Sequence, residues 1–219
     1  MKLLLACLLA MSMADLAMSE KVPGTISVVS GLSNADFAVR ATDAATEEAI
    51  FAGGCFWCLE EAMEKVPGTI SVVSGYTGGR LKNPTYEQVS SGGTGHLEAV
   101  RVTYDPAKVT YAQLVEAFWH NIDPTDAGGQ FCDRGEQYRA AIFVRDADQR
   151  AVAEQSKRAI ETSGKVKDRI ATTIQPASAF YVAEEYHQDY YKKNPVRYRF
   201  YKFSCGRAQR LETIWGSTK

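Results

Sequence analysis

The chain has 219 residues, 45% of them hydrophobic, and a formal net charge of −1. This length suits one domain with a substantial apolar core, which argues against a disordered or purely scaffolding protein. The near-zero charge gives no overall attraction to nucleic acid or to an anionic membrane, so neither is expected as a partner.

The first fourteen residues have the pattern of a secretory signal. Lys2 precedes an apolar run at 3–10 and a small-x-small site at 12–14. We expect residues 1–14 to direct export, to the periplasm if the source is bacterial, whereas a leader without function would leave the protein in the cytoplasm. Cleavage would remove Cys7 and leave four cysteines, an even number that suits thiol–disulfide cycling in an oxidising compartment.

A lead-in segment, residues 15–46, follows, and its order is not predicted by the sequence. It contains the twelve residues EKVPGTISVVSG at 20–31, which recur identically at 64–75. Twelve residues are too few for an independent domain, so they do not indicate a repeat architecture. The catalytic domain is predicted to occupy residues 47–219.

The sequence GCFWC at 54–58 is the most informative part of the chain. A short buried strand is predicted at 49–52, and apolar residues recur at helical spacing from Phe56 until Pro67. Cys55 therefore lies at a predicted helix N-terminus, where the helix dipole is expected to lower the pKa of its thiol. A buried structural cysteine is the alternative. Against it, the preceding glycine pair allows a close approach of backbone or ligand.

Glu98 is the candidate acid. It begins a strand predicted at 98–104, in which Glu98, Val100, Val102 and Tyr104 share one face by two-residue alternation. Desolvation on this apolar face would raise the pKa of the carboxyl group, so that it could donate a proton near neutral pH. An exposed glutamate at a strand end is the alternative.

The remaining predicted elements alternate irregularly between strands and helices. A strand at 70–74, a glycine-rich loop from Gly75, a helix opened by a Thr110–Gln113 capping box, and a helix at 146–163 are the clearest. The other predictions are a strand carrying Tyr138, Ala140, Ile142 and Val144 on one face, a strand at 172–175, a short helix at 183–192, and an irregular tail containing Cys205. This pattern predicts an α+β fold, a two-layer sandwich with a mixed sheet and packed helices.

Five motifs in one order give the chain a family resemblance. They are GCFWC at 54–58, GYTGG at 75–79, NPTYEQV at 83–89, TGHLEAV at 94–100 and DRGEQYR at 133–139. Together they resemble the A-type peptide methionine sulfoxide reductases over about residues 47–219. The resemblance implies a ferredoxin-like core, no cofactor, and reduction of peptide-bound and free methionine S-sulfoxide, which repairs oxidised proteins.

The resemblance also implies a pocket with two kinds of wall. The apolar cradle for the substrate methyl group would be Phe56 and Trp57. The groups around the sulfoxide oxygen would be Tyr86, Glu98 and Tyr138, supported by Asp133. Taken singly, the two tyrosines and the aspartate would be ordinary structural hydrogen-bonding residues.

In the implied reaction, Cys55 attacks the sulfoxide sulfur while Glu98 protonates the oxygen, giving methionine and a Cys55 sulfenic acid. A second thiol then forms a disulfide, which a thioredoxin-like partner reduces. Cys58 and Cys205 are both candidates, with Cys58 favoured first and Cys205 as a second relay. Cys132 is expected to be a packed thiol, and the protein to be a monomer.

Two other functions compete with this interpretation. A thioredoxin-like dithiol–disulfide oxidoreductase would also place CxxC between a strand and a helix, but it would need neither Glu98 nor Tyr138. A structural zinc module would have to use four cysteines of which only two form a close pair, so no metal is expected.

Overall fold

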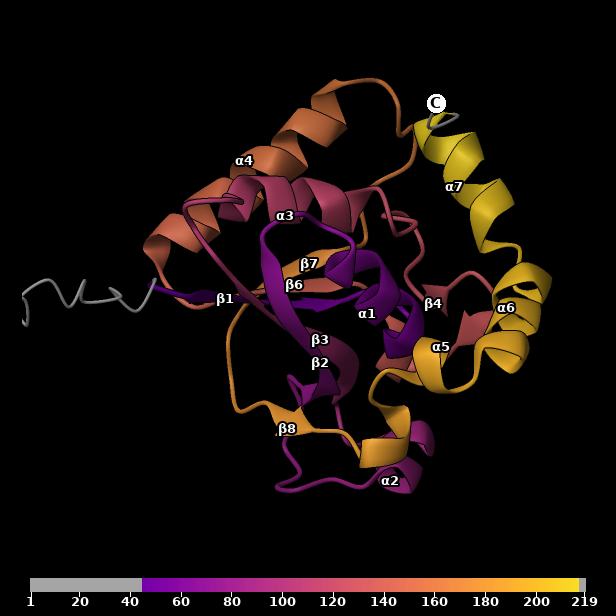
Figure 1. Cartoon of the computed structure of the whole chain (residues 1–219). Helices are drawn as coiled ribbons and strands as arrows, with labels where there is room; N and C mark the ends of the chain where they lie inside the picture. Colours follow the sequence, from indigo (N-terminus) through magenta and orange to yellow (C-terminus); the bar gives the residue numbers. More distant parts are fainter. Residues whose placement is uncertain (1–44, 217–219) are drawn as a thin grey trace, which may run out of the picture. The chain divides into compact units, whose positions relative to one another are not determined.

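The computed structural model describes residues 45–216, and six strands form its main sheet in the order β7-β6-β1-β3-β2-β8 (Figure 1). These strands are β1 (Glu47–Ala52), β2 (Thr69–Thr77), β3 (Leu97–Tyr104), β6 (Ala141–Val144), β7 (Thr173–Pro176) and β8 (Tyr181–Val182). All neighbouring pairs are antiparallel except β6 with β7, which is parallel. The sheet is therefore mixed, as predicted.

Seven α-helices accompany the sheet in the described part of the chain. They are α1 (Phe56–Glu64), α2 (Tyr86–Ser90), α3 (Tyr111–Trp119), α4 (Ala147–Thr162), α5 (Tyr190–Lys193), α6 (Pro195–Ser204) and α7 (Arg207–Trp215). Short elements complete the set: a two-stranded sheet of β4 (Gly129–Gln130) and β5 (Asp133–Arg134), and the 3-10 turns η1 (Glu136–Tyr138) and η2 (Glu185–His187).

The centre of the fold is ferredoxin-like. Along the chain β1, α1, β2 and β3 are followed by helices and β6, and in the sheet β3 lies between β1 and β2 while β6 lies on the other side of β1. This order is that of a split β-α-β unit. The α+β class and the ferredoxin-like core are thus confirmed. The predicted capping box of Thr110 and Gln113 begins α3, and the Asp146 side chain caps α4 by accepting from the backbone N–H of Gln149.

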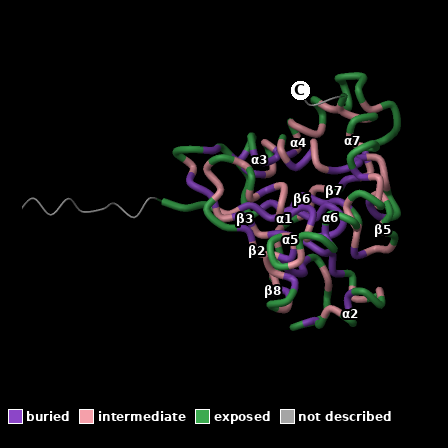
Figure 2. Tube along the Cα trace, turned by 45° about the vertical axis from the view of Figure 1, so that its right-hand side comes forward, coloured by how far each residue is buried: buried purple, intermediate pink, exposed green. Residues whose placement is uncertain are grey.

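Helices α1, α3 and α4 cover one face of this sheet, and α3 and α4 lie side by side on it (Figure 1). The strands alternate between faces, so Phe51, Val100 and Ile142 join the core under the helices, whereas Ile50, Ala99 and Phe143 join a smaller cluster with Phe180. Figure 2 shows the buried backbone concentrated along the central strands. The chemistry described below lies on the helical side.

Three local predictions are wrong. The predicted loop at Gly75 begins too early, since β2 continues to Thr77 because its last residues pair with Leu97 and Glu98 of β3. Tyr138 belongs to η1 and not to the strand, which begins at Ala141. The tail is not irregular either, because Pro195 at an N-terminal position starts α6, and α7 follows it.

Residues 1–14 and the lead-in segment lie outside the described residues, apart from the last two residues of the lead-in. The first EKVPGTISVVSG copy is among those undescribed residues, whereas the second forms the end of α1 and most of β2. Within residues 45–216, no helix combines the length and the apolar character needed to cross a bilayer.

Candidate active site

The turn from β1 to α1 presents Cys55. Gly54 has φ of +82°, and a Cβ atom there would lie 2.6 Å from Cβ of Gln130, so this position requires glycine. Cys55 is the N-cap residue of α1 and is 5% exposed. The predicted placement of this cysteine at a strand-to-helix turn is therefore observed.

A cavity of about 190 Å³ opens above Cys55 and gathers every predicted catalytic and substrate-binding residue. Its lining consists of Cys55, Phe56, Trp57, Tyr86, Glu98, Asp133, Tyr138 and Tyr201. Phe56 and Trp57 supply apolar wall, and the carboxyl and hydroxyl groups supply polar wall. The cavity can therefore hold a small group that has an apolar end and a hydrogen-bonding end.

Glu98 is held at the start of β3 with its carboxyl group under α1. The backbone N–H of Phe56 donates to Oε2 of Glu98 at 3.1 Å. Burial raises the pKa of Glu98 to about 8, although this hydrogen bond opposes the shift. The carboxyl group is therefore mainly protonated at neutral pH and can donate a proton into the cavity.

Asp133 and Tyr201 form a second polar pair beside the nucleophile. The Tyr201 hydroxyl donates to Oδ2 of Asp133 at 2.7 Å, and the same hydroxyl interacts with the sulfur of Cys55. Burial raises the pKa of Asp133, while the hydrogen bond from Tyr201 acts in the opposite direction. Tyr201 was not predicted, because it lies on a helix that the sequence analysis read as an irregular tail.

Trp57 is fixed between two residues of the C-terminal segment. Its indole Nε1 donates to Nδ1 of His187 at 3.1 Å, and its ring stacks on Tyr190 with centroids 3.7 Å apart. Burial lowers the pKa of His187, so its ring is neutral and can accept this hydrogen bond. The apolar wall of the cavity is thereby held rigid from the side away from the substrate.

Tyr86 owes its position to Glu184. One carboxylate oxygen of Glu184 accepts from the backbone N–H of Tyr86 at 2.8 Å, and the other accepts from the Tyr76 hydroxyl at 2.8 Å. Tyr86 begins α2, which is capped by a box between Thr85 and Gln88. That T-x-x-Q spacing is readable in the sequence and could have predicted α2.

The acidity of Cys55 differs from the prediction. Burial raises the pKa of Cys55, so the prediction of a lowered pKa there is wrong. The thiol of Cys55 hydrogen-bonds to the sulfur of Cys58 and lowers the pKa of Cys58 to about 6, and the nearby guanidinium of Arg207 acts in the same direction. The pair therefore carries one negative charge and one proton near neutral pH.

Cys132 and Cys205 form a disulfide with their Cα atoms 4.9 Å apart. The prediction of a packed Cys132 thiol is therefore wrong. Cys205 lies at the C-terminal end of α6, and its disulfide joins it to Cys132, the residue before Asp133. In this state Cys205 is not a free thiol that could reach Cys55. Cys55 and Cys58 are free. A relay function for Cys205 stays a prediction.

The sequence profile described as peptide methionine sulfoxide reductase matches residues 47–219. The chain belongs to this family.

Curated members of the reductase family are similar over most of their length. The chain is 56% identical over 172 residues to peptide methionine sulfoxide reductase MsrA 2 of Caulobacter vibrioides, covering 78% of this chain and 86% of that protein. It is 54% identical over 170 residues to MsrA of Limosilactobacillus reuteri, covering 77% of this chain and 97% of that protein.

A solved structure has the same fold. The reduced form of Mxr1 from Saccharomyces cerevisiae aligns with a TM-score of 0.64 at 33% identity, covering 70% of this chain and 88% of that one.

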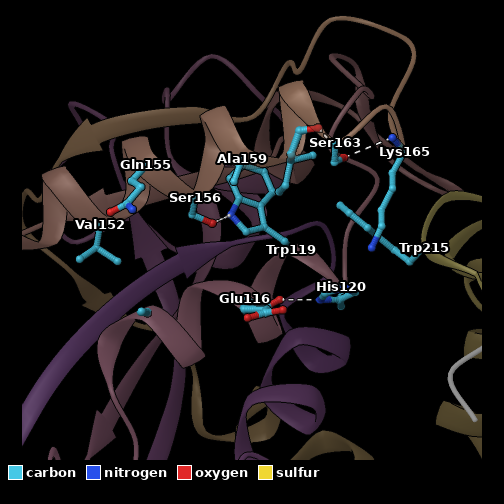
Figure 3. Close-up of a pocket in the computed structure, with 12 residues that line it drawn as sticks. Glu116, Trp119, His120, Val152, Gln155, Ser156, Ala159, Ser163, Lys165 and Trp215 are labelled. Carbon is cyan, nitrogen blue, oxygen red and sulfur yellow. Dashed lines mark hydrogen bonds between the residues drawn. The ribbon is translucent and has the colours of Figure 1, made fainter. Parts of the chain in front are cut away.

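A larger cavity of this reductase, about 440 Å³, lies away from the thiols between α3, α4 and α7. Figure 3 shows Trp119 in its wall, with Nε1 donating to Oγ of Ser156 at 2.7 Å, and a hydrogen bond of 3.0 Å between Nδ1 of His120 and the backbone carbonyl oxygen of Glu116. None of the predicted site residues lines it. Size alone would therefore not have selected the smaller cavity, in which the candidate acid Glu98 and the thiol of Cys55 lie together.

The four cysteines do not form one zinc-ligand set in the described structure. Cys132 and Cys205 share a disulfide, and disulfide sulfurs lack the thiolate charge that zinc requires. The sulfurs of Cys132 and Cys205 lie near the Asp133 carboxylate. Because the sulfurs are in a disulfide, these three residues offer one anionic ligand and not three.

Proposed function

We propose that this protein reduces peptide-bound and free methionine S-sulfoxide to methionine through a thiol cycle at Cys55. The observation that carries this proposal is the shared cavity in which a protonated Glu98 and the Cys55 sulfur face the same small space. A sulfoxide needs both groups, because its oxygen must be protonated as its sulfur is attacked.

The cavity walls suggest how the substrate lies. The methyl group fits against Phe56 and Trp57, while the oxygen points to Glu98, Tyr86 and Tyr138. A pocket with these unlike walls is handed, so it should accept one sulfur epimer. Comparing turnover of the separated S and R epimers tests this assignment, and equal rates for both would contradict it.

The paired thiols supply the nucleophile. As Cys55 attacks the sulfoxide sulfur, its proton passes along the hydrogen bond to Cys58, whose pKa of about 6 leaves it ionised at rest. Glu98 protonates the oxygen, the oxygen is transferred to Cys55, and methionine leaves. The products are methionine and a Cys55 sulfenic acid, so the substrate loses one oxygen that the enzyme gains.

Cys58 resolves the sulfenic acid in this proposal. Its sulfur attacks the Cys55 sulfur, a disulfide forms, and the oxygen leaves as water. Two residues separate the two cysteines, so only the first turn of α1 has to adjust. A thioredoxin-like dithiol then reduces the disulfide and regenerates both thiols.

Mass spectrometry after one stoichiometric turnover tests this cycle. We expect a Cys55–Cys58 disulfide in the wild type and a Cys55 sulfenic acid in Cys58→Ser. Cys205→Ser should still form the Cys55–Cys58 disulfide. A disulfide between Cys55 and Cys205 in the wild type would contradict the assignment of Cys58.

We also infer that residues 1–14 export the protein to an oxidising compartment, where it acts as a monomer without a bound metal. The Cys132–Cys205 disulfide supports this location, because such bonds persist where thiols are oxidised. Cell fractionation with and without residues 1–14 tests it, and an uncleaved protein in the cytoplasm would contradict it.

The rival thioredoxin-like function needs no proton donor beside the thiols. Glu98 and Tyr138 line the same cavity as Cys55, which favours sulfoxide reduction. Insulin disulfide reduction, measured beside methionine sulfoxide reduction, separates the two functions. Faster reduction of insulin would favour the rival.

A further inference from the structure

A second cavity, about 520 Å³, reaches the thiol pair at Cys58. Residues of α6 and α7 form much of its wall, and no residue lines both this cavity and the one that holds Cys55. The two cysteines of the CxxC turn therefore line two different cavities. This volume lies within the range of sites that bind small molecules.

Arg207 gives the second cavity a buried positive charge. The residue is 3% exposed, and its guanidinium donates to the backbone carbonyl oxygens of Asn121 at 2.7 Å and Gly53 at 3.3 Å. Both partners are neutral, and Arg207 forms no ion pair within 4 Å among residues 45–216. The guanidinium lies over the Phe131 ring, 4.3 Å from its centroid, and its charge acts on the Cys58 thiolate; once Cys58 is in a disulfide, this charge can act on an anion in the cavity.

Lys202 adds a second cation at the opening. Its side chain is 39% exposed and pairs with Glu61 at 2.6 Å, and Glu61 also pairs with Lys65 at 2.6 Å. Lys65 does not line the cavity, whereas Lys202 does. Glu212 is the acidic residue of the wall, so the cavity has two basic side chains and one acidic one.

We propose that this cavity binds a small thiol that carries a carboxylate, and that this thiol attacks the sulfur of Cys58. The inference rests on the proposed function, because it needs the Cys55–Cys58 disulfide as its partner. The carboxylate lies toward Arg207 and Lys202, and the thiol sulfur lies against Cys58. Substrate and reductant thus approach the same disulfide through separate openings.

The exchange balances in two steps. The thiolate of the first molecule bonds to Sγ of Cys58, the Cys55–Cys58 bond breaks, and Cys55 leaves as a thiolate. A second thiolate attacks the small-molecule sulfur of the mixed disulfide and releases Cys58 as a thiolate. Two thiols are oxidised to one disulfide, and the enzyme gains the two electrons that restore both cysteines.

Position favours attack on Cys58 in the first step, and acidity favours the second. In the first, Cys58 is the cysteine that lines the second cavity, while the departing Cys55 lines the sulfoxide cavity. In the second, Cys58 is the leaving group, and a thiol of low pKa leaves faster; the hydrogen bond with Cys55 and the charge of Arg207 lower the pKa of Cys58.

The experiment begins with the full-length enzyme oxidised by one stoichiometric turnover. We measure the rate of disulfide reduction by 3-mercaptopropionate, 2-mercaptoethanol and cysteamine, which are anionic, neutral and cationic, and correct each rate for the thiolate fraction. The anionic thiol should react roughly tenfold faster than the cationic one. Peptide mapping of the quenched reaction should place the mixed disulfide on Cys58.

Matched variants separate this site from general surface charge. Lys202→Gln should lower the preference for 3-mercaptopropionate over cysteamine roughly threefold, whereas Lys65→Gln should leave it unchanged, although both lysines pair with Glu61. Ala208→Trp places a large ring in the cavity from an exposed position of α7, and it should slow all three thiols. Circular dichroism and the melting temperature establish that each variant is folded.

Several results would overturn the inference. They are a mixed disulfide on Cys55 or Cys205, equal corrected rates for the three thiols, or equal effects of Lys202→Gln and Lys65→Gln. If no Cys55–Cys58 disulfide formed in the first turnover, the proposed resolving step itself would be wrong. A disulfide that forms but is reduced without regard to charge would contradict only the second cavity.

Discussion

The catalytic cavity is built from two unlike regions. The ferredoxin-like core supplies the proposed reacting groups, Cys55 at the start of α1 and Glu98 at the start of β3. The C-terminal segment from Glu184 to Arg207 supplies groups that hold them, including His187 against Trp57 and Tyr201 against Asp133. The core therefore provides the groups proposed to react, and the C-terminal segment positions the residues around them. Mutations in the two regions should therefore have different effects on the rate.

The largest effect is expected in the core, at Cys55. Cys55→Ser should abolish methionine formation even in a single turnover, because no other described sulfur lines the cavity. Cys58→Ser is the matched control, and it should form one methionine per enzyme and then stop. Quantifying methionine in both variants provides the measurement, and substantial oxygen removal by Cys55→Ser would refute the mechanism.

Glu98→Gln should have the next largest effect, a fall of roughly 10² to 10⁴ in the single-turnover rate, since the amide cannot donate the proton. The pKa of Glu98 is about 8 because the carboxyl group is buried. The donor is the protonated form, so the wild-type rate should fall as pH rises above about 8. The variant should lack this fall. A wild-type profile that stays flat from pH 7 to 9.5 would remove Glu98 from this role.

Tyr201→Phe tests the C-terminal contribution. Loss of the hydroxyl removes a hydrogen bond to the Asp133 carboxylate and a contact with Cys55, so the single-turnover rate should fall roughly tenfold. Tyr191→Phe is the control, because its hydroxyl bonds to Glu64 away from the cavity. Equal rates for the two variants would show that the C-terminal segment does not position the site.

The Cys132–Cys205 disulfide should affect stability more than chemistry. It closes a loop between residues 73 positions apart, so Cys132→Ser and Cys205→Ser should each lose about 2 to 4 kcal/mol of the free energy of unfolding. The two variants should have equal melting temperatures and retain the first turnover. If Cys205→Ser alone stopped cycling, Cys205 would be a redox relay and not only part of a brace.

The same division explains what could be predicted from the sequence. The fold class, the position of Cys55, and the burial of Glu98 followed from local patterns, namely the glycine pair, the alternation of β3 and the capping boxes. The family motifs predicted that Tyr86, Asp133 and Tyr138 would line the cavity. All three do, although Tyr138 lies in a 3-10 turn and not in a strand.

The parts that were missed depend on contacts between distant segments. The pairing of Cys132 with Cys205 and the contact of Tyr201 with Asp133 have no local pattern, because each joins residues about seventy positions apart. The acidity of Cys55 was predicted wrongly for a related reason. A helix N-terminus can be read from the sequence, but the desolvation that raises the pKa depends on residues that cover the turn from elsewhere.

The bond from Trp57 to His187 joins residues 130 positions apart, and it has a consequence for biosynthesis. Domains begin to fold while the ribosome is still adding residues, yet this wall of the cavity cannot form until His187 has been translated. A nascent chain that holds Cys55 and Glu98 but has not reached His187 and Tyr201 would lack the contacts that position Trp57 and Asp133. We therefore expect the activity to begin only after these residues have been added.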